Sequence, residues 1–303
     1  MGNEVSATVG HDSSTNDLQG VQTFVYPTKD ELFRKVYVGE WVDGKRHGKG
    51  TLEWRNGAVY QGQWDSDTLC GIGSFHLPTS GVQYEGEFLD NQFHGAGVLT
   101  WKDNGRQYNG SWHEGKHHGY GTLKYDNNDS RQRIFYKGEW KHGKRHGYGI
   151  MKWRSGAQYE GNWTRGQRDG SGKQTFCNGD IHVGKWKGAS RHGPGCRYLI
   201  NGDKMFGTWK NDKKHGLFEY RYAHGRVEAR LYVDGKLSPE PIAQEVPSLQ
   251  VLAIEAIARK KNIATEAETL CPPDLAEAIK RRREHENSKG LVNRLLKNIL
   301  AST

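Results

Sequence analysis

The feature that most constrains this chain is a short pattern of tyrosine, glycine and a large aromatic residue that returns about every 23 residues. The pattern Y-x-G-x-[WF] starts at residues 37, 60, 84, 108, 136 and 159, weaker copies start at 182 and 205, and a trace remains at 228. The successive steps are 23, 24, 24, 28, 23, 23, 23 and 23 residues. A fixed period of this length is typical of repeat architectures, in which each unit buries its apolar side chains against its neighbours.

A second motif follows each tyrosine by about ten residues and reads HGKG, CGIG, HGAG, HGYG, HGYG, DGSG and HGPG before it degenerates to HGLF. Each repeat therefore has room for two short strands. In the first repeat these are VYVGEW and GKGTLEW, with VDGKRH as the link between them. The D-G and N-G pairs favour turns, because glycine adopts positive φ without a steric penalty. The longest step contains DNNDSRQR, which we interpret as a surface-loop insertion after Tyr125.

The glycines of the pattern predict how the strands pack. Strand alternation puts Tyr37, Gly39 and Trp41 on one face. A glycine weakens a strand unless another group packs on its bare backbone, so we expect an aromatic ring from an adjacent strand to lie on each glycine. The repeat positions to which this applies are Tyr37, Gly39, Trp41, Tyr60, Gly62, Trp64, Tyr84, Gly86, Phe88, Tyr108, Gly110, Trp112, Tyr136, Gly138, Trp140, Tyr159, Gly161, Trp163, Gly184, Trp186, Gly207 and Trp209.

The composition divides the chain into three parts. All ten tryptophans lie between Trp41 and Trp209, and thirty-six of the forty glycines lie between Gly39 and Gly235. We therefore predict a flexible N-terminal segment at 1–35, an array of about eight repeats and a degenerate last one at 36–238, and a helical segment at 239–303. No run approaches the roughly 20 apolar residues of a membrane-spanning helix, and the N-terminus lacks the apolar core of a secretory signal. Four scattered cysteines predict reduced thiols in a cytoplasmic protein.

Together the two motifs read Y-x-G-x-[WF]-x-x-G-x-x-x-G-x-G, which resembles the MORN repeat over about residues 36–235. The clearest copies are YVGEWVDGKRHGKGTLEW and YKGEWKHGKRHGYGIMKW. The resemblance implies a mainly β fold, an elongated single antiparallel sheet of β-hairpins. It also implies a non-enzymatic role in assembly, dimerisation or binding of acidic lipids, in the cytoskeleton and in the axonemes of cilia and flagella. His182 and Met205 stand at tyrosine positions, which indicates that the C-terminal end of the array needs a cap.

The last part of the chain has a helical pattern. The stretches SLQVLAIEAIARKKN, PDLAEAIKRRREHEN and KGLVNRLLKNIL predict three helices. The third places six large aliphatic side chains on one stripe: Leu291, Val292, Leu295, Leu296, Ile299 and Leu300. Four of them are candidates for contact with the array, a protein partner or a second copy of the chain: Leu291, Leu295, Leu296 and Ile299.

The sequence offers no constellation for catalysis or for a cofactor. Equivalent histidines of successive repeats would lie two strands apart, roughly 9–10 Å, whereas ligands of one zinc ion each lie about 2 Å from it. We therefore expect turn residues that bond to the backbone, and no metal site, at His47, His94, His118, His146, His192 and His215. No pair of carboxylates and no nucleophile stands out, so an enzyme is not expected. Because the rings are needed for the core, nucleic acid is not an expected partner either.

The formal net charge of +9 points to an acidic protein or lipid partner. The candidate residues, predicted to lie in loops or in the helical segment, are Lys45, Arg46, Lys144, Arg145, Lys280, Arg281, Arg282 and Arg283. The N-terminus MGNEVS fits N-myristoylation of Gly2, although one acyl chain alone binds a membrane only marginally. The sequence thus predicts a scaffold of a ciliary, flagellar or cytoskeletal complex, with a membrane-associated module for acidic lipids as the alternative.

Overall fold

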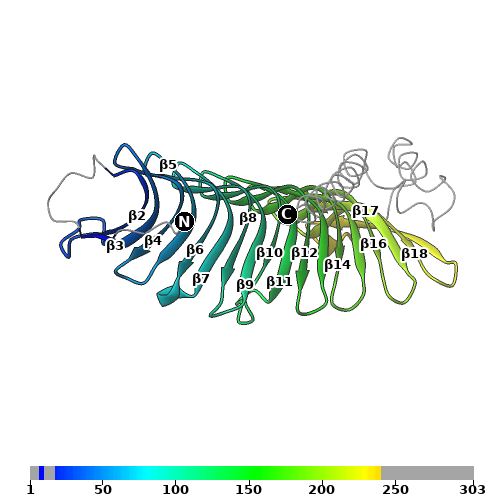
Figure 1. The fold of residues 1–303 in the computed structure, drawn as a ribbon. Coiled ribbons are helices and arrows are strands. Elements are labelled where there is room, and N and C mark those ends of the chain that lie inside the picture. Colours follow the sequence, from blue (N-terminus) through cyan, green and yellow to red (C-terminus); the bar gives the residue numbers. More distant parts are fainter. Residues whose placement is uncertain (1–6, 10–17, 240–303) are drawn as a thin grey trace, which may run out of the picture. The chain divides into compact units, whose positions relative to one another are not determined.

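The computed structural model describes residues 7–9 and 18–239, and nearly all of the regular structure in this range is β-strand (Figure 1). The described residues fall into two units, which we treat separately. The first unit comprises residues 7–9, 18–145 and 151–154, and the second comprises residues 146–150 and 155–239. The predicted helical segment and the myristoylation motif at Gly2 lie outside the described residues.

The strands of the first unit are β1 (Ala7–Val9), β2 (Gly20–Val25), β3 (Arg34–Val42), β4 (Lys45–Trp54), β5 (Val59–Asp65), β6 (Thr68–Leu77), β7 (Val82–Leu89), β8 (Gln92–Trp101), β9 (Arg106–His113), β10 (Lys116–Lys124) and β11 (Arg133–Lys141), with a 3-10 turn at Pro78–Ser80. Residues of β12 (Lys144–Trp153) belong to both units. The second unit continues with β13 (Gln158–Thr164), β14 (Gln167–Thr175), β15 (Ile181–Lys187), β16 (Ser190–Tyr198), β17 (Lys204–Lys210), β18 (Lys213–Arg221), β19 (Val227–Val233) and β20 (Lys236–Leu237).

Consecutive strands pair with one another in each unit. From β2 to β11 every strand is antiparallel to the next, and the same holds from β13 to β20. The exception is β1, which pairs parallel with β2. The predicted mainly β hairpin-repeat architecture is therefore confirmed.

Each hairpin turns in only two residues, which is shorter than the predicted link VDGKRH. In the first repeat β3 ends at Val42 and β4 begins at Lys45, and the turn residues Asp43 and Gly44 have φ of 49° and 69°. Positive φ at both positions is the geometry of the type I′ turn, whose twist matches that of the strands. Lys45 and Arg46 consequently lie in a strand, whereas the sequence predicts that they lie in a loop.

The two glycines of the second motif have different tasks, as the second repeat shows. Gly71 has a φ of 53° and lies in a β-bulge, where the register shifts between Gly62 and Gln63. The side chain of Gln63 stabilises the bulge, because its Oε1 accepts a hydrogen bond of 2.7 Å from the backbone N–H of Ile72. Gly73 instead pairs directly with Gly62 and lies beneath an aromatic ring. The motif therefore combines one glycine for backbone conformation with one for close packing.

The array begins earlier than the sequence indicates. We had predicted a flexible segment up to residue 35, but β2 pairs over its full length with β3, from Gly20 opposite Trp41 to Val25 opposite Val36. The sequence pattern failed here because β2 lacks the Y-x-G-x-[WF] motif and supplies only Phe24 to the buried face.

A compact loop joins β2 to β3. Within residues 26–34, the guanidinium group of Arg34 donates to the buried carboxylate of Asp30 at 2.7 Å and lies 4.1 Å from the ring centroid of Tyr26. From outside the loop, the guanidinium group of Arg55 donates to the backbone carbonyl of Tyr26 at 3.0 Å. We refer to this arrangement as the first Asp–Arg loop.

The predicted insertion after Tyr125 has the same construction. Arg133 donates to the buried carboxylate of Asp129 at 2.5 Å and lies 3.9 Å from the ring centroid of Tyr125. Arg154 donates to the backbone carbonyl of Asp126 at 3.0 Å. Residues 125–133 therefore form a second Asp–Arg loop, 99 residues after the first.

Candidate docking surface

The tyrosines of the repeat form a ladder of rings on one face of the sheet. Tyr60 is fully buried and packs edge-to-face between Trp64 and Phe88, with ring centroids 5.2 and 5.0 Å away. Its Oη donates to the backbone carbonyl of Gln63 at 2.9 Å, and burial raises the pKa of its hydroxyl well above the ordinary value. A Cβ atom on Gly73 would lie only 2.6 Å from that hydroxyl oxygen. This ring face is therefore occupied by the core itself.

The tryptophans connect one hairpin to the next. The indole N–H of Trp64 donates to the backbone carbonyl of Gly50 at 3.2 Å, and that of Trp112 donates to the carbonyl of Gly97 at 3.2 Å. Each bond reaches back to the preceding hairpin, because Gly50 lies in β4 and Trp64 in β5. At these two positions the polar end of the indole is used inside the core and is not offered to a ligand, whereas the indole N–H groups of Trp41 and Trp209 are buried without a hydrogen-bond partner.

A further core position was missed by the sequence argument. The residue after the first lysine of β4 is Arg46, which is only 7% exposed, lies 4.2 Å from the ring centroid of Trp64 and donates to Asp67 at 2.6 Å. At the equivalent position, Phe93 stacks on Tyr84 with centroids 3.8 Å apart. Side chains of very different charge and shape therefore fill one site, which explains why no residue pattern revealed it. Others at this position that contact rings are His117, Arg145, Arg168, Arg191 and Lys214.

The second unit departs from the tyrosine ladder at two repeats. His182 occupies the first tyrosine position, between Trp186 and Trp209 at 5.6 and 5.2 Å, and neither of its ring nitrogens has a hydrogen-bond partner. Burial, together with the nearby arginines, lowers the pKa of His182 to about 3, so the ring is neutral in the fold.

The last repeat exchanges the roles of its two strands. Met205 stands at the tyrosine position, and Phe218 replaces the glycine that would pair with Gly207. A Cβ atom on Gly207 would lie 2.6 Å from the Phe218 ring, and that ring packs against Trp209 at 5.4 Å. The loss of the tyrosine from the first strand is therefore compensated in the degenerate HGLF motif, since the opposite strand supplies the ring.

The opposite face of the sheet, which we call the second face, carries the side chains that alternate with the rings. In the first unit its middle row is largely polar and runs in register through Val38, Thr51, Gln61, Ser74, Glu85, Val98, Asn109, Thr122 and Lys137.

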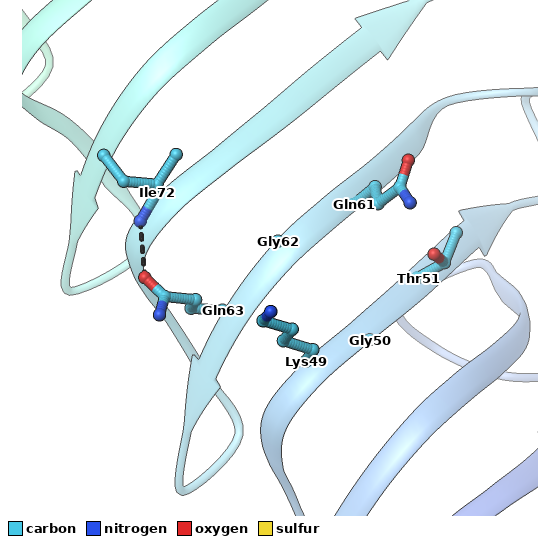
Figure 2. Close-up of a pocket in the computed structure, with 7 residues that line it drawn as sticks. All are labelled: Lys49, Gly50, Thr51, Gln61, Gly62, Gln63 and Ile72. Carbon is cyan, nitrogen blue, oxygen red and sulfur yellow. Dashed lines mark hydrogen bonds between the residues drawn. The ribbon is translucent and has the colours of Figure 1, made fainter. Parts of the chain in front are cut away.

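A shallow hollow interrupts this face where two glycines leave the backbone bare. It has a volume of about 540 Å³, and Gly50 and Gly62 form its floor. Figure 2 shows the side chains of Lys49, Gln63 and Ile72 around it, and Ile72 is 62% exposed. The hollow is open and lined by one charged, several polar and one apolar side chain, which suits contact with another macromolecule better than enclosure of a small ligand.

The row at the equivalent positions of the second unit is partly apolar. Lys173 pairs with Val183, Val183 with Cys196, and Cys196 with Phe206. Burial raises the pKa of the Cys196 thiol to about 11, so this side chain behaves as a small neutral group. Ile181 pairs with Tyr198 beside this row, and all five side chains are half-buried. We call Ile181, Val183, Cys196, Tyr198 and Phe206 the apolar patch.

The predicted basic residues do not form a continuous stripe. Lys45, Lys116 and Lys144 are exposed at the starts of β4, β10 and β12. Acidic residues occupy the turns of the same edge, among them Asp43, Asp67, Asp90 and Glu114. Burial lowers the pKa of Arg145, and Arg46 is ion-paired with Asp67, so neither arginine is an exposed cation as we had expected.

The repeated histidines lie in strands and not in turns. The Nδ1 atom of His47 lies 3.5 Å from the Asp65 carboxylate, and that of His215 lies 3.3 Å from Asp234. Within residues 7–9 and 18–239 the structure contains no group of three or more histidine, cysteine or acidic side chains able to hold a metal ion. In the same range no helix has both the length and the apolar character needed to cross a membrane.

Several predicted partner-binding residues cannot be placed on this surface. The aliphatic stripe and the basic cluster of the C-terminal segment lie outside the described residues, as does Gly2. They are Leu291, Leu295, Leu296, Ile299, Lys280, Arg281, Arg282 and Arg283.

Known proteins resemble parts of this chain. MORN repeat-containing protein 3 of Xenopus laevis is 40% identical over 45 residues, which cover 14% of this chain and 19% of the frog protein. Alsin of Rattus norvegicus is 36% identical over 47 residues, which cover 16% of this chain and 3% of alsin. The aligned part therefore spans a fifth or less of these relatives.

Solved structures give weaker likenesses. The G-box domain of the microcephaly protein CPAP aligns at a TM-score of 0.35 and 13% identity, covering 71% of this chain and 100% of that domain. A mutant TCP10 domain of Danio rerio CPAP aligns at a TM-score of 0.34 and 17% identity, covering 68% of this chain and 95% of that domain.

The family comparison is more extensive. The model of the MORN repeat matches eight segments, namely residues 37–59, 60–82, 84–106, 108–130, 136–158, 159–181, 182–204 and 206–222. These segments coincide with the hairpins described above and include the two repeats in which His182 and Met205 replace tyrosine. The chain therefore belongs to the MORN repeat family.

Proposed function

We propose that this chain is a non-enzymatic scaffold that binds proteins through the second face of its sheet, in a cytoskeletal assembly such as the axoneme of a cilium or flagellum. The ring face is filled by the core, so the second face is the surface that remains for partners. The location follows from the frequent occurrence of MORN arrays in flagellar radial spokes and other axonemal parts.

The observation that carries this proposal is the apolar patch. It occupies the repeat positions that carry a largely polar row in the first unit, yet Val183, Cys196 and Phe206 place three apolar side chains side by side. A sheet face that needs only solvation has no reason to expose such a cluster, whereas half-buried aromatic and aliphatic groups ringed by charge are typical of binding sites. Arg221 lies 5.2 Å from the Phe206 ring and supplies charge at its border.

Proximity labelling in ciliated cells tests this function, with the enzyme tag at the C-terminus. We expect the wild-type chain to label axonemal proteins and the double variant V183S/F206S to lose at least about tenfold of that labelling, because central apolar contacts dominate interface energies. The matched control Q61S/N109S changes two polar members of the middle row in the first unit. Equal labelling by both variants, with unchanged melting temperatures, would contradict the proposal.

A second candidate is a membrane-associated module, optionally myristoylated at Gly2. The alternation of lysines with acidic turn residues argues against attachment through a basic stripe alone. Membrane binding would therefore need an apolar element, and one is present in the first unit.

A further inference from the structure

The two Asp–Arg loops hold different side chains in the same frame. In the first loop the residues before Arg34 are Leu32 and Phe33, which are 63% and 69% exposed. In the second loop the equivalent residues before Arg133 are Arg131 and Gln132, which are also exposed. Phe33 and Gln132 both have a φ of 55°, so the left-handed backbone belongs to the frame and does not depend on the side chain.

The second loop serves as an internal control for the first. The backbone N–H of Gln132 donates to the carbonyl of Asp129 at 2.8 Å, and that of Phe33 donates to the carbonyl of Asp30 at 3.0 Å. Since a polar tip closes with the same bonds, the fold does not require Leu32 to be apolar or Phe33 to be aromatic. Two adjacent large apolar side chains exposed on a loop held by an ion pair to a buried carboxylate indicate an interaction site.

We propose that Leu32 and Phe33 insert into the interfacial region of a lipid bilayer and act as a second attachment point beside an acyl chain on Gly2. This inference rests on the membrane-associated function named above. A single myristoyl chain gives marginal, reversible binding, and a second contribution is needed for stable attachment. Leucine and phenylalanine are among the side chains that interfacial anchors use for this purpose.

β1 lies beside β2, the strand that leads into the first loop. β1 pairs parallel with β2, with Ala7 opposite Thr23 and Val9 opposite Val25. The loop follows directly after Val25. Five residue steps separate Gly2 from Ala7, which limits their distance to about 18 Å. An acyl group on Gly2 is thereby tethered within about 18 Å of Ala7, which is the end of β1 that lies farther from the loop.

The charges around the tip favour insertion over electrostatic attraction. Lys35 is paired with Glu53 at 2.6 Å, and the exposed residues Lys29 and Glu31 carry opposite charges. With nearly balanced charge, the tip gains little from an acidic headgroup. We therefore expect its contribution to be similar on neutral and acidic vesicles and to persist at high salt, unlike that of a basic stripe.

The test uses the full chain acylated at Gly2 by co-expressed N-myristoyltransferase, sedimented with phosphatidylcholine vesicles that contain or lack phosphatidylserine. The variant L32R/F33Q gives the first loop the tip of the second. We expect it to bind phosphatidylcholine vesicles at least about tenfold more weakly, because two large apolar side chains no longer leave water. The loss on vesicles with phosphatidylserine should be smaller, because the added guanidinium group is attracted to the acidic headgroups. The control R131A/Q132A should bind like the wild type, and both variants should keep the wild-type melting temperature.

Each other outcome overturns the inference in a distinguishable way. If the acylated wild type binds vesicles and L32R/F33Q binds equally well, the loop has no part in attachment, and the membrane-associated function stands without it. If the acylated wild type remains in the supernatant, both ideas are wrong. Loss of axonemal labelling by L32R/F33Q would then assign the tip to a pocket on a protein partner.

Discussion

The two units build the same hairpins around different rings. In the first unit Tyr60 and Tyr108 are fully buried, pack between aromatic neighbours and donate a hydrogen bond to their own strand. In the second unit His182 keeps the position but leaves its nitrogens unbonded, and Phe218 supplies its ring from the opposite strand. The difference shows that a hairpin needs one ring and one bare stretch of backbone, whichever strand provides each.

The strongest test of this rule exchanges the ring and the glycine in the second unit. Phe218→Gly removes a fully buried ring and should lower the free energy of unfolding by about 3–5 kcal/mol. The double variant M205Y/F218G restores the arrangement of the first unit and should recover most of that loss, as measured by denaturant unfolding. If the double variant is no more stable than Phe218→Gly, the strands are not interchangeable.

The matching experiment in the first unit adds a side chain where a ring lies. A Cβ atom on Gly121 would lie 2.4 Å from the hydroxyl oxygen of Tyr108, so Gly121→Val should cost about 3 kcal/mol or more. Gly143→Val provides the contrast, because nothing lies within 4 Å of a Cβ atom there and only its φ of 75° penalises the change. Comparable losses in both variants would mean that backbone conformation, and not ring packing, explains the glycines.

A change of pH tests the buried histidine that replaces tyrosine in the second unit. His182 has a pKa of about 3 in the fold, against about 6.5 when exposed, so the fold favours its neutral form. Its contribution is complete above about pH 6.5 and is lost as the pH falls toward the folded pKa, which amounts to about 2–3 kcal/mol by about pH 4.5.

His182→Tyr should remove this loss and also add the missing hydroxyl bond. The measurement is the melting temperature at neutral and acidic pH, with the exposed residue His224 changed to Gln as the control. His117, whose pKa burial lowers to about 4, remains in every variant and sets the residual acid sensitivity. An unchanged pH dependence in His182→Tyr would show that this ring is not the source.

The smallest expected effect concerns the position that varies most between repeats. Arg46→Ala removes the group above Trp64 and the partner of Asp67, and we expect a loss of about 1–2 kcal/mol. The neighbouring change Lys45→Ala alters an exposed side chain and should stay within about 0.5 kcal/mol. Thermal melting at low and high salt distinguishes the two variants. Because Arg46 is nearly buried, the loss of stability in Arg46→Ala should persist at high salt. Equal losses of stability in the two variants would mean that Arg46 behaves as an exposed basic residue.

The sequence predicts the hairpins well because their requirements are local. Tyrosine, glycine and tryptophan positions recur with the period of the repeat, so the ring packing follows from strand alternation. The site of Arg46 and Phe93 escaped prediction since stacking accepts cations and aromatic rings alike. β2 escaped because it lacks the motif, although the 99-residue recurrence that relates the two Asp–Arg loops is visible in the sequence. The apolar patch depends on register across three strands, which no single repeat encodes.

The reach of the tryptophan hydrogen bonds has a consequence for how the protein is made. Trp64 bonds to Gly50 and Trp186 to Gly172, in each case only 14 residues back along the chain. Core contacts of this kind close as soon as the next strand has left the ribosome, and none of these bonds waits for a distant segment. Chains with such local contacts fold rapidly and expose few unpaired strand edges at a time. We infer that the hairpins fold in order during synthesis, and that each hairpin provides the strand edge with which the next one pairs.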